Sequence, residues 1–385
     1  MKNLWISLPA YAPDYSGICS AFFDLGGISV IHDASGCTGN YTGYDEPRWF
    51  GSSAKVFCSG LREIDAVMGN DEKLLENTIN AGSLFPPSVY AVIGSPVPMV
   101  IGSDMRGIAR ELEERTGVPA FGFDANGINL YDKGISDALC ALIRRFTKPV
   151  NSIVPGSVNL LGTNPLDLGP GGNADDVEKA LTDRGWRVAG KMMMGAAIEQ
   201  IETLSQAQVN LVVTASGLAA ARLLQEKYST PYVVGMPLGN CVDVFSALEE
   251  TAQDGVCRVL RDNAGDGVLI VGEQVCANSL RRALICKSPN LGVTVAAMTA
   301  FEDELAGKGD LAVPEEEQML DLLESGRFHT LIGDPIFGDI LPSQMRLIPL
   351  PHPALSSKLY WDDVPAFLGT EMRELVELAV DNSII

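Results

Sequence analysis

Residues 209–239 read VNLVVTASGLAAARLLQEKYSTPYVVGMPLG, and this stretch decides the fold. A β-branched apolar run at 209–215 leads into a helical pattern at 216–229, and a second β-branched run follows at 230–239. A strand, a helix and another strand in close succession are typical of a βαβ unit, in which the two strands pair in parallel. The stretch therefore predicts an α/β domain with a parallel sheet.

The same alternation occurs in three parts of the chain. A chain of 385 residues also exceeds the roughly 250–300 residues at which a single core stops growing. We therefore expect an α/β protein of three Rossmann-like domains with parallel sheets. The expected domains are an N-terminal domain at 1–150, a middle domain at 151–262 and a C-terminal domain, ending in a helix, at 263–385.

Ligands of such sheets bind beyond the carboxyl ends of the strands, in glycine-rich turns. No GxGxxG motif lies between a strand and a helix, and GxxxxGK[ST] does not occur, so neither a dinucleotide nor an ATP site is indicated. The turns expected to carry the chemistry are those at 35–40, 94–104, 162–173, 214–217, 235–240 and 272–278.

The charge of the chain excludes some partners. The 49 acidic and 28 basic residues give a net charge of −21, which repels the phosphates of nucleic acid and of anionic lipid. The first residues lack the parts of a signal peptide, and no apolar run reaches about 18 residues. We therefore expect a cytoplasmic protein that binds neither nucleic acid nor a membrane.

Eight cysteines in a chain of this kind indicate reduced thiols, some of them packing residues and some metal ligands. No CxxC pair occurs, which argues against a zinc ribbon or a ferredoxin-type loop. Cys19 precedes an amphipathic helical pattern, and Cys37 lies in a Gly-Cys-Thr-Gly turn after a strand. A thiolate near a helix N-terminus is stabilised and suited to bind iron, whereas the alternative for Cys19 is a buried packing residue.

The segment from His32 to Cys37, HDASGC, resembles the His-[small]-x-x-Gly-Cys turn of the nitrogenase component 1 superfamily. Relatives of that superfamily include dark-operative protochlorophyllide reductase and the coenzyme F430 reductive cyclase. The likeness continues through 55–81, 92–121 and most of the remaining chain. It implies an oxidoreductase subunit with an iron–sulfur cluster near the N-terminus.

Three departures from the family pattern are visible. Ser95 and Pro96 stand where the third cluster cysteine is usual, and Thr214 stands where the catalytic nitrogenase subunit has its cofactor cysteine. The histidine that completes the attachment of that cofactor also has no evident counterpart. An iron–molybdenum cofactor is therefore not expected.

A [4Fe–4S] cluster takes four ligands, and Cys19 and Cys37 supply two. A twofold homodimer sharing one cluster is the simplest completion, with a paralogous heterodimer as the alternative. Cys58 is a weaker third candidate, with a packing role favoured. The resemblance implies an ATP-dependent iron–sulfur reductase as electron donor, and Arg48 and Trp49 are candidate docking residues near the cluster turns.

The substrate is expected where the three domains converge. Cys276, in the turn at 272–278, is a weak cofactor ligand, with packing favoured, and the methionines at 192–194 contact a cofactor or fill the core. His352 lies in a proline-fixed loop and is a ligand, an acid or a structural residue. For His329 a structural role is expected. No catalytic residue can be named from the sequence.

Three functions remain open. The first is a reductase that passes single electrons to a small molecule or a tetrapyrrole. The second is a scaffold for metallocofactor assembly, and the third is a small-molecule binding protein without a cluster.

Overall fold

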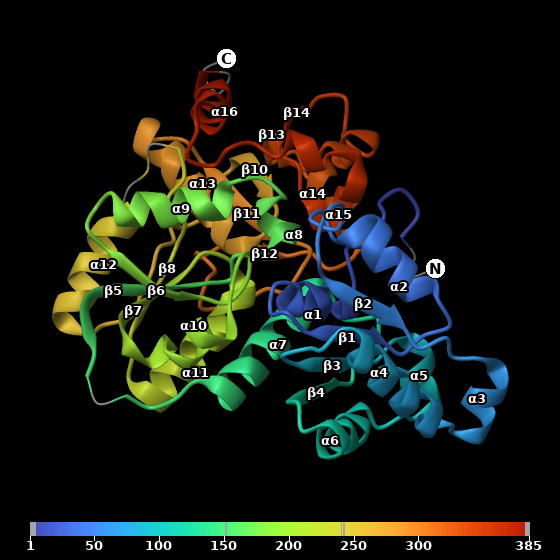
Figure 1. Cartoon of the computed structure of the whole chain (residues 1–385). Coiled ribbons are helices and arrows are strands. Elements are labelled where there is room, and N and C mark those ends of the chain that lie inside the picture. Colours follow the sequence, from blue (N-terminus) through green and yellow to red (C-terminus); the bar gives the residue numbers. More distant parts are fainter. Residues whose placement is uncertain (1–4, 151, 240, 242, 382–385) are drawn as a thin grey trace.

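The computed structural model describes residues 5–150, 152–239, 241 and 243–381. It contains three separate sheets flanked by helices (Figure 1), and every strand pairing within those sheets is parallel. The predicted fold class is confirmed. The exact domain boundaries remain a prediction. None of the helices in the described ranges combines the length and the apolar character needed to cross a bilayer.

The N-terminal sheet has the strand order β2-β1-β3-β4. Its two central strands are buried on both faces, as in parallel sheets covered by helices on each side. The strands are β1 (Ile28–Ile31), β2 (Lys55–Cys58), β3 (Tyr90–Ile93) and β4 (Ala120–Phe123). The helices are α1 (Asp14–Phe22), α2 (Gly36–Asn40), the π-helical η1 (Tyr41–Asp45), α3 (Glu63–Met68), α4 (Asp71–Leu84), α5 (Pro96–Ile101), α6 (Met105–Thr116) and α7 (Tyr131–Phe146).

Alternating strand residues build a core on each face of this sheet. Ile31 and Ile93 pack with α1 and α7, whereas Val30 and Val92 pack with α4 and α6. This period of two follows from the geometry of a strand, whose successive side chains point to opposite faces.

The middle sheet has the order β6-β5-β7-β8-β9. Helices α9 and α12 cover one face, and α10, α11 and part of α7 cover the other. The strands are β5 (Val154–Leu161), β6 (Arg187–Lys191), β7 (Ala207–Val212), β8 (Tyr232–Val234) and β9 (Arg258–Val259). The helices are α8 (Pro165–Leu168), α9 (Asn173–Thr182), α10 (Ile198–Glu202), η2 (Leu204–Gln206), η3 (Ala215–Gly217), α11 (Leu218–Tyr228) and α12 (Asp243–Asp254).

The C-terminal sheet has the order β12-β11-β10-β13-β14. Helices α13 and α16 pack on one face, and α14 packs on the other. The strands are β10 (Gly267–Val271), β11 (Val293–Ala297), β12 (Leu311–Ala312), β13 (Phe328–Gly333) and β14 (Arg346–Pro349). The helices are α13 (Gln274–Lys287), α14 (Glu316–Glu324), η4 (Pro335–Asp339), α15 (Pro353–Ser356), η5 (Ser357–Leu359), η6 (Trp361–Asp363) and α16 (Thr370–Asp381).

Helix α7 connects the N-terminal and middle domains. It packs against α1 on one side and against α11 and α10 on the other (Figure 1). Its contact with α1 depends on glycines, because a Cβ at Gly17 would lie 2.0 Å from the carbonyl oxygen of Tyr131, and a Cβ at Gly134 would lie 2.0 Å from that of Asp14. The two backbones therefore touch, and this contact fixes the start of α7 at the junction of the domains.

Candidate functional site

The loops that follow β1, β2 and β3 meet at the carboxyl edge of the N-terminal sheet. Asp33 joins them, because its carboxylate accepts the amide proton of Cys37 at 2.8 Å and its carbonyl accepts the thiol of Cys58 at 3.2 Å. Ser95, after β3, donates to the carbonyl of His32 at 2.8 Å. We call Asp33, Cys37, Cys58 and Ser95 the cysteine edge.

Cys37 lies in the first turn of α2 and is half-buried. Burial, followed by the charge of Asp33, raises the pKa of its thiol, whereas hydrogen bonds with the hydroxyls of Tyr15 and Ser95 lower it. Ser95, which stands at the usual third cysteine position, therefore contacts Cys37. A cation bound at Cys37 would remove the repulsion that opposes its thiolate.

Cys58 ends β2 and is also half-buried. Its sulfur accepts the amide proton of Gly60 at 3.3 Å. Amide donors of this kind stabilise a thiolate that binds a metal. Although the sequence favoured a packing role, Cys58 hydrogen-bonds to Asp33, the residue that also accepts the amide proton of Cys37.

The prediction that Cys19 precedes a helix is wrong. Helix α1 begins at Asp14, so Cys19 lies inside it, where its side chain has an exposed fraction of 0%. Burial, together with the charges of Glu46 and Asp45, raises the pKa of this thiol well above its ordinary value. The first turn of the helix was missed because Pro13 and Asp14 look like loop residues, although they suit a helix start. Cys19 as a ligand remains a prediction.

The predicted docking residues have structural partners. Arg48 bonds to Glu46 at 2.7 Å and to Asp24 at 2.9 Å, and only 13% of its side chain is exposed. The ring of Trp49 packs edge-on against Tyr41. The charge of Arg48 is already paired, and the ring of Trp49 already packs against another ring. Docking through these residues therefore remains a prediction only.

Exposed apolar side chains lie on helices next to the cysteine edge. Helix α3 follows Cys58, and α5 begins directly after Ser95. Both helices lie toward the right-hand margin of Figure 1. Gathered apolar groups of this kind mark interaction surfaces. The residues are Ile64, Val67 and Met68 on α3 and Val97, Met99, Val100 and Ile101 on α5.

A second polar group lies where the three domains meet. His352 Nε2 is 3.0 Å from Asp167 Oδ1 and 3.0 Å from the hydroxyl of Tyr131, and that hydroxyl also donates to Asp167. Asp132 and Glu273 lie close enough to influence the pKa values of the group. We call Tyr131, Asp132, Asp167, Glu273 and His352 the inner cluster. It takes residues from all three predicted domains.

Burial raises the pKa values of Tyr131, Asp132 and Glu273 in the inner cluster and so favours their protonated forms. Glu273 caps α13 and accepts amide protons from Ala215, Val275 and Cys276 at 2.7–3.0 Å. Burial, followed by the charge of Asp167, nevertheless raises the pKa of Glu273 to about 7. Nδ1 of His352 is buried and has no partner among the described residues. The cluster can therefore hold and exchange protons near neutral pH.

The remaining predicted site residues have contacts that indicate structural roles. Burial raises the pKa of the Cys276 thiol well above its ordinary value, and its sulfur is 3.7 Å from that of Met236, which agrees with packing. Thr214 donates to the carbonyl of Gly162 at 2.7 Å. Met192 and Met193 belong to the core, and exposed His329 bonds to neighbouring Thr330.

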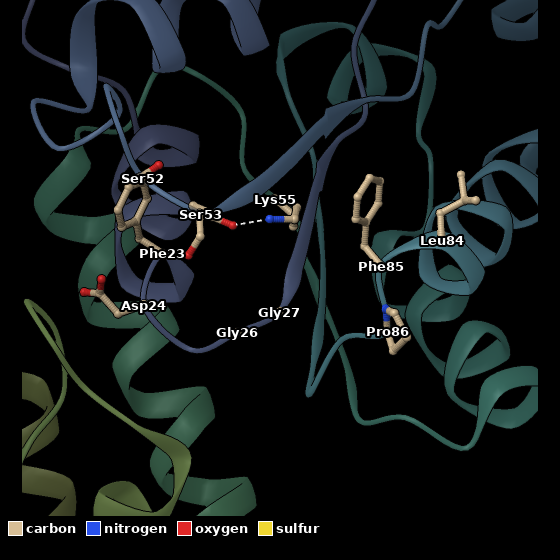
Figure 2. Close-up of a pocket in the computed structure, with 11 residues that line it drawn as sticks. Phe23, Asp24, Gly26, Gly27, Ser52, Ser53, Lys55, Leu84, Phe85 and Pro86 are labelled. Carbon is tan, nitrogen blue, oxygen red and sulfur yellow. Dashed lines mark hydrogen bonds between the residues drawn. The ribbon is translucent and has the colours of Figure 1, made fainter.

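A large hollow of about 600 Å³ lies at the other end of the N-terminal sheet. Figure 2 shows Gly27 just before β1, and Lys55 at the start of β2, beside Phe85. Lys55 donates to the carbonyl of Ser53. These are the amino ends of the strands, whereas ligands of parallel sheets bind at the carboxyl ends. The hollow is therefore separate from both the cysteine edge and the inner cluster.

The protonation of Glu273 has a measurable effect on stability. Because its folded pKa of about 7 lies above its ordinary value of 4.5, the folded chain binds more protons than the unfolded chain between these values. The contribution of Glu273 to the free energy of unfolding should therefore fall by about 2.5 kcal/mol as the pH rises from 5 to 8. Urea unfolding at several pH values measures how the free energy of unfolding depends on pH. We expect Glu273→Gln to flatten the slope of that dependence, even if the substitution lowers stability at every pH.

Glu199→Gln is the matched control, because Glu199 is exposed on α10. It should keep the slope of the unsubstituted chain. An unchanged slope in Glu273→Gln would show that Glu273 is ionised throughout this range.

The family model of nitrogenase component 1 type oxidoreductases matches residues 15–256, which is more than half of the chain. The chain belongs to this family. The cysteine edge and Asp167 of the inner cluster both lie inside the matched range.

Individual relatives agree with that membership. The iron–molybdenum cofactor biosynthesis protein NifE of Rhodobacter capsulatus is 27% identical over 294 residues, covering 72% of this chain and 56% of that protein. One of the subunits of the light-independent protochlorophyllide reductase of Synechococcus elongatus is 23% identical, covering 44% of this chain and 36% of the relative. The chain thus spans about half the length of the curated NifE relatives it matches.

A solved structure supports the fold over the whole chain. Nitrogenase Cp1 at pH 6.5 aligns with a TM-score of 0.71 and 13% identity, covering 100% of this chain and 95% of the Cp1 chain. At this identity the likeness establishes the fold and not the reaction. Family members include oxidoreductases and a cofactor biosynthesis protein.

Proposed function

We propose that the chain is a nitrogenase-like reductase subunit that receives low-potential electrons through an iron–sulfur cluster at the cysteine edge. The observation that carries the proposal is the convergence of Cys37 and Cys58 on Asp33, beside the exposed apolar residues of α3 and α5. Two half-buried thiols at one surface suit a cluster shared across a subunit interface. Membership of the oxidoreductase family supports the same interpretation.

Four ligands are needed for a [4Fe–4S] cluster. A twofold dimer would supply them as Cys37 and Cys58 from each chain, because an isologous interface presents the same residues twice. Ser95 would lie beside Cys37, with its hydroxyl within hydrogen-bonding reach of the sulfur. Cys19, the ligand first expected, is fully buried in α1 and is the alternative to Cys58 as the second ligand. A bound cluster supplies reversible one-electron transfer.

The electron donor proposed for this surface is an ATP-dependent iron–sulfur reductase. The described part of the chain contains no nucleotide loop of its own, and the sequence has no Walker motif, so ATP hydrolysis would belong to the partner. The apolar residues of α3 and α5 would form the contact between the two copies or between paralogous subunits.

The substrate is proposed to bind at the inner cluster. Tyr131, Asp167 and His352 form a hydrogen-bonded set, and the charge of Asp167 contributes to raising the pKa of nearby Glu273 to about 7. Reduction of an unsaturated bond consumes protons as well as electrons. The inner cluster would supply the protons to a small molecule or a tetrapyrrole held between the domains.

The test is iron analysis of the full chain purified without oxygen, with EPR after reduction by dithionite. A [4Fe–4S] cluster shared by two chains predicts about two iron atoms and two sulfides per chain. Cys37→Ser and Cys58→Ser should each lose most of the iron and the EPR signal. Cys19→Ser should keep both if Cys58 is the second ligand, and should lose both if Cys19 is.

Cys140→Ala is the matched control, because Cys140 is a buried thiol of α7 far along the chain from these loops. It should retain iron and signal. Circular dichroism verifies that each variant is folded. A folded, unsubstituted chain that contains no iron after anaerobic purification and reconstitution would overturn the proposal.

A scaffold for metallocofactor assembly is the second candidate, and the similarity to NifE favours it. The two functions differ in turnover. A scaffold should release a metal cluster to an acceptor protein without consuming electrons, whereas a reductase should oxidise its reduced partner only when substrate is present. Stopped-flow measurement of the oxidation of the electron donor separates them.

A further inference from the structure

We propose that Cys241, Asp243 and Cys286 form a binding site for a divalent cation that prefers sulfur ligands, such as Zn²⁺. Their two sulfurs and one carboxylate oxygen all lie within 4.8 Å of one another. Cys241 follows β8, Asp243 begins α12, and Cys286 lies near the end of α13. The site therefore joins the middle and C-terminal domains and is independent of the cysteine edge.

The spacing suits tetrahedral coordination. Metal–sulfur bonds of about 2.3 Å at a tetrahedral angle put two thiolate sulfurs about 3.8 Å apart. Atoms already within 4.8 Å of one another need to move by only about 1 Å to reach that arrangement. Two thiolates and one carboxylate are ligands that Zn²⁺ accepts, and they leave its fourth position open.

The site carries charged groups of both signs, with Arg282 beside Asp243 and with Lys287 and Arg373 lining the adjoining cavity. The amide of Asp243 donates to the sulfur of Cys241, which stabilises the thiolate. A divalent ion would add two positive charges among three negative ligands, and Arg282, 2.6 Å from Asp243 Oδ2, would neutralise the remainder.

The site is accessible to an incoming ion. A cavity of about 270 Å³ opens beside it and is lined by both cysteines together with Lys287 and Arg373. Cys286 is exposed, whereas Cys241 is buried. An ion can therefore enter from solvent past Cys286, and a water or a small anion can occupy the fourth position from the cavity.

The test is equilibrium titration of the full chain with Cd²⁺, in which binding is monitored by the ultraviolet thiolate-to-Cd²⁺ absorption. The affinity for Zn²⁺ is measured by competition with a chromophoric chelator. The background carries Cys37→Ser and Cys58→Ser, so that the cysteine edge does not contribute. We expect one ion per chain. Cys241→Ser and Cys286→Ser should each raise the Kd for Zn²⁺ at least about 100-fold, because even outer partners of a ligand change affinity by 10–100-fold.

Asp243→Asn should weaken binding while retaining the thiolate absorption. Cys257→Ser is the matched control, because this half-buried cysteine bonds to Gln225 instead and should leave the Kd unchanged. Binding that survives in the Cys241→Ser/Cys286→Ser double variant would overturn the proposal. So would mass spectrometry showing that these two cysteines are joined as a disulfide in the reduced, anaerobic preparation. Neither result depends on the iron content of the cysteine edge.

Discussion

Replacing Arg281 with Met is expected to lower the free energy of unfolding of the C-terminal domain by about 3–5 kcal/mol. Arg281 and Asp310 both have side-chain exposed fractions of 0%, and two nitrogens of the guanidinium contact the two carboxylate oxygens at 2.6 and 2.9 Å. Removal of the cation leaves the carboxylate buried and without its counter-charge. Native-state hydrogen exchange of the β10 and β11 amides measures the loss in the domain concerned.

Two controls test this prediction: a double variant that removes both charges of the buried pair, and a variant that removes an exposed arginine. Asp310 also accepts the amide protons of Val295 and Gly307, so it ties β11 to the loop before β12. The double variant Arg281→Met/Asp310→Asn should lose less than the sum of the single variants, because it leaves no uncompensated charge. Arg222→Met, which breaks exposed pairs with Glu302 and Glu304, should cost less than about 1 kcal/mol. Equal losses at Arg281 and Arg222 would contradict the assignment.

Gly134→Ala is expected to destabilise the chain by about 2–4 kcal/mol, although alanine is the better helix former. The added methyl carbon would lie 2.0 Å from the carbonyl oxygen of Asp14, so α7 would have to move away from α1. This movement displaces Tyr131, three residues earlier on α7, from Asp167. Urea unfolding measures the loss of stability.

Gly171→Ala is the control for Gly134→Ala. A Cβ at Gly171 meets no atom within 4 Å, so this change should alter stability by less than about 0.5 kcal/mol. If Gly134→Ala were as mild as Gly171→Ala, the backbone contact between α1 and α7 would be looser than the structure shows.

The fold could be predicted because its strands and helices follow simple periods. The run at 209–213 is apolar throughout except for Asn210, as expected for a central parallel strand, and β7 (Ala207–Val212) is buried on both faces. Short elements were harder. β9 and β12 contain two residues each, so no periodic pattern can identify them, and tertiary pairing alone makes them strands.

The site was predictable where it lies in strand-end turns. Asp33, Asp167 and Glu273 follow β1, β5 and β10, at the edge where ligands of parallel sheets bind, and two of these residues lie in the expected turns at 162–173 and 272–278. Tyr131 gave no such signal. It lies 221 residues from His352 in sequence, and only the packing of α7 between domains brings the two side chains together.

Because the inner cluster takes residues from all three predicted domains, its affinity for a guest molecule depends on how those domains are arranged. Tyr131, Asp167 and His352 come one from each predicted domain, so a rotation that widens the junction separates all three at once. Each hydrogen bond lost costs about 0.5–1.5 kcal/mol. A guest molecule that enters between the domains must replace those bonds with its own polar groups, which selects hydrogen-bonding guests over purely apolar ones of equal size.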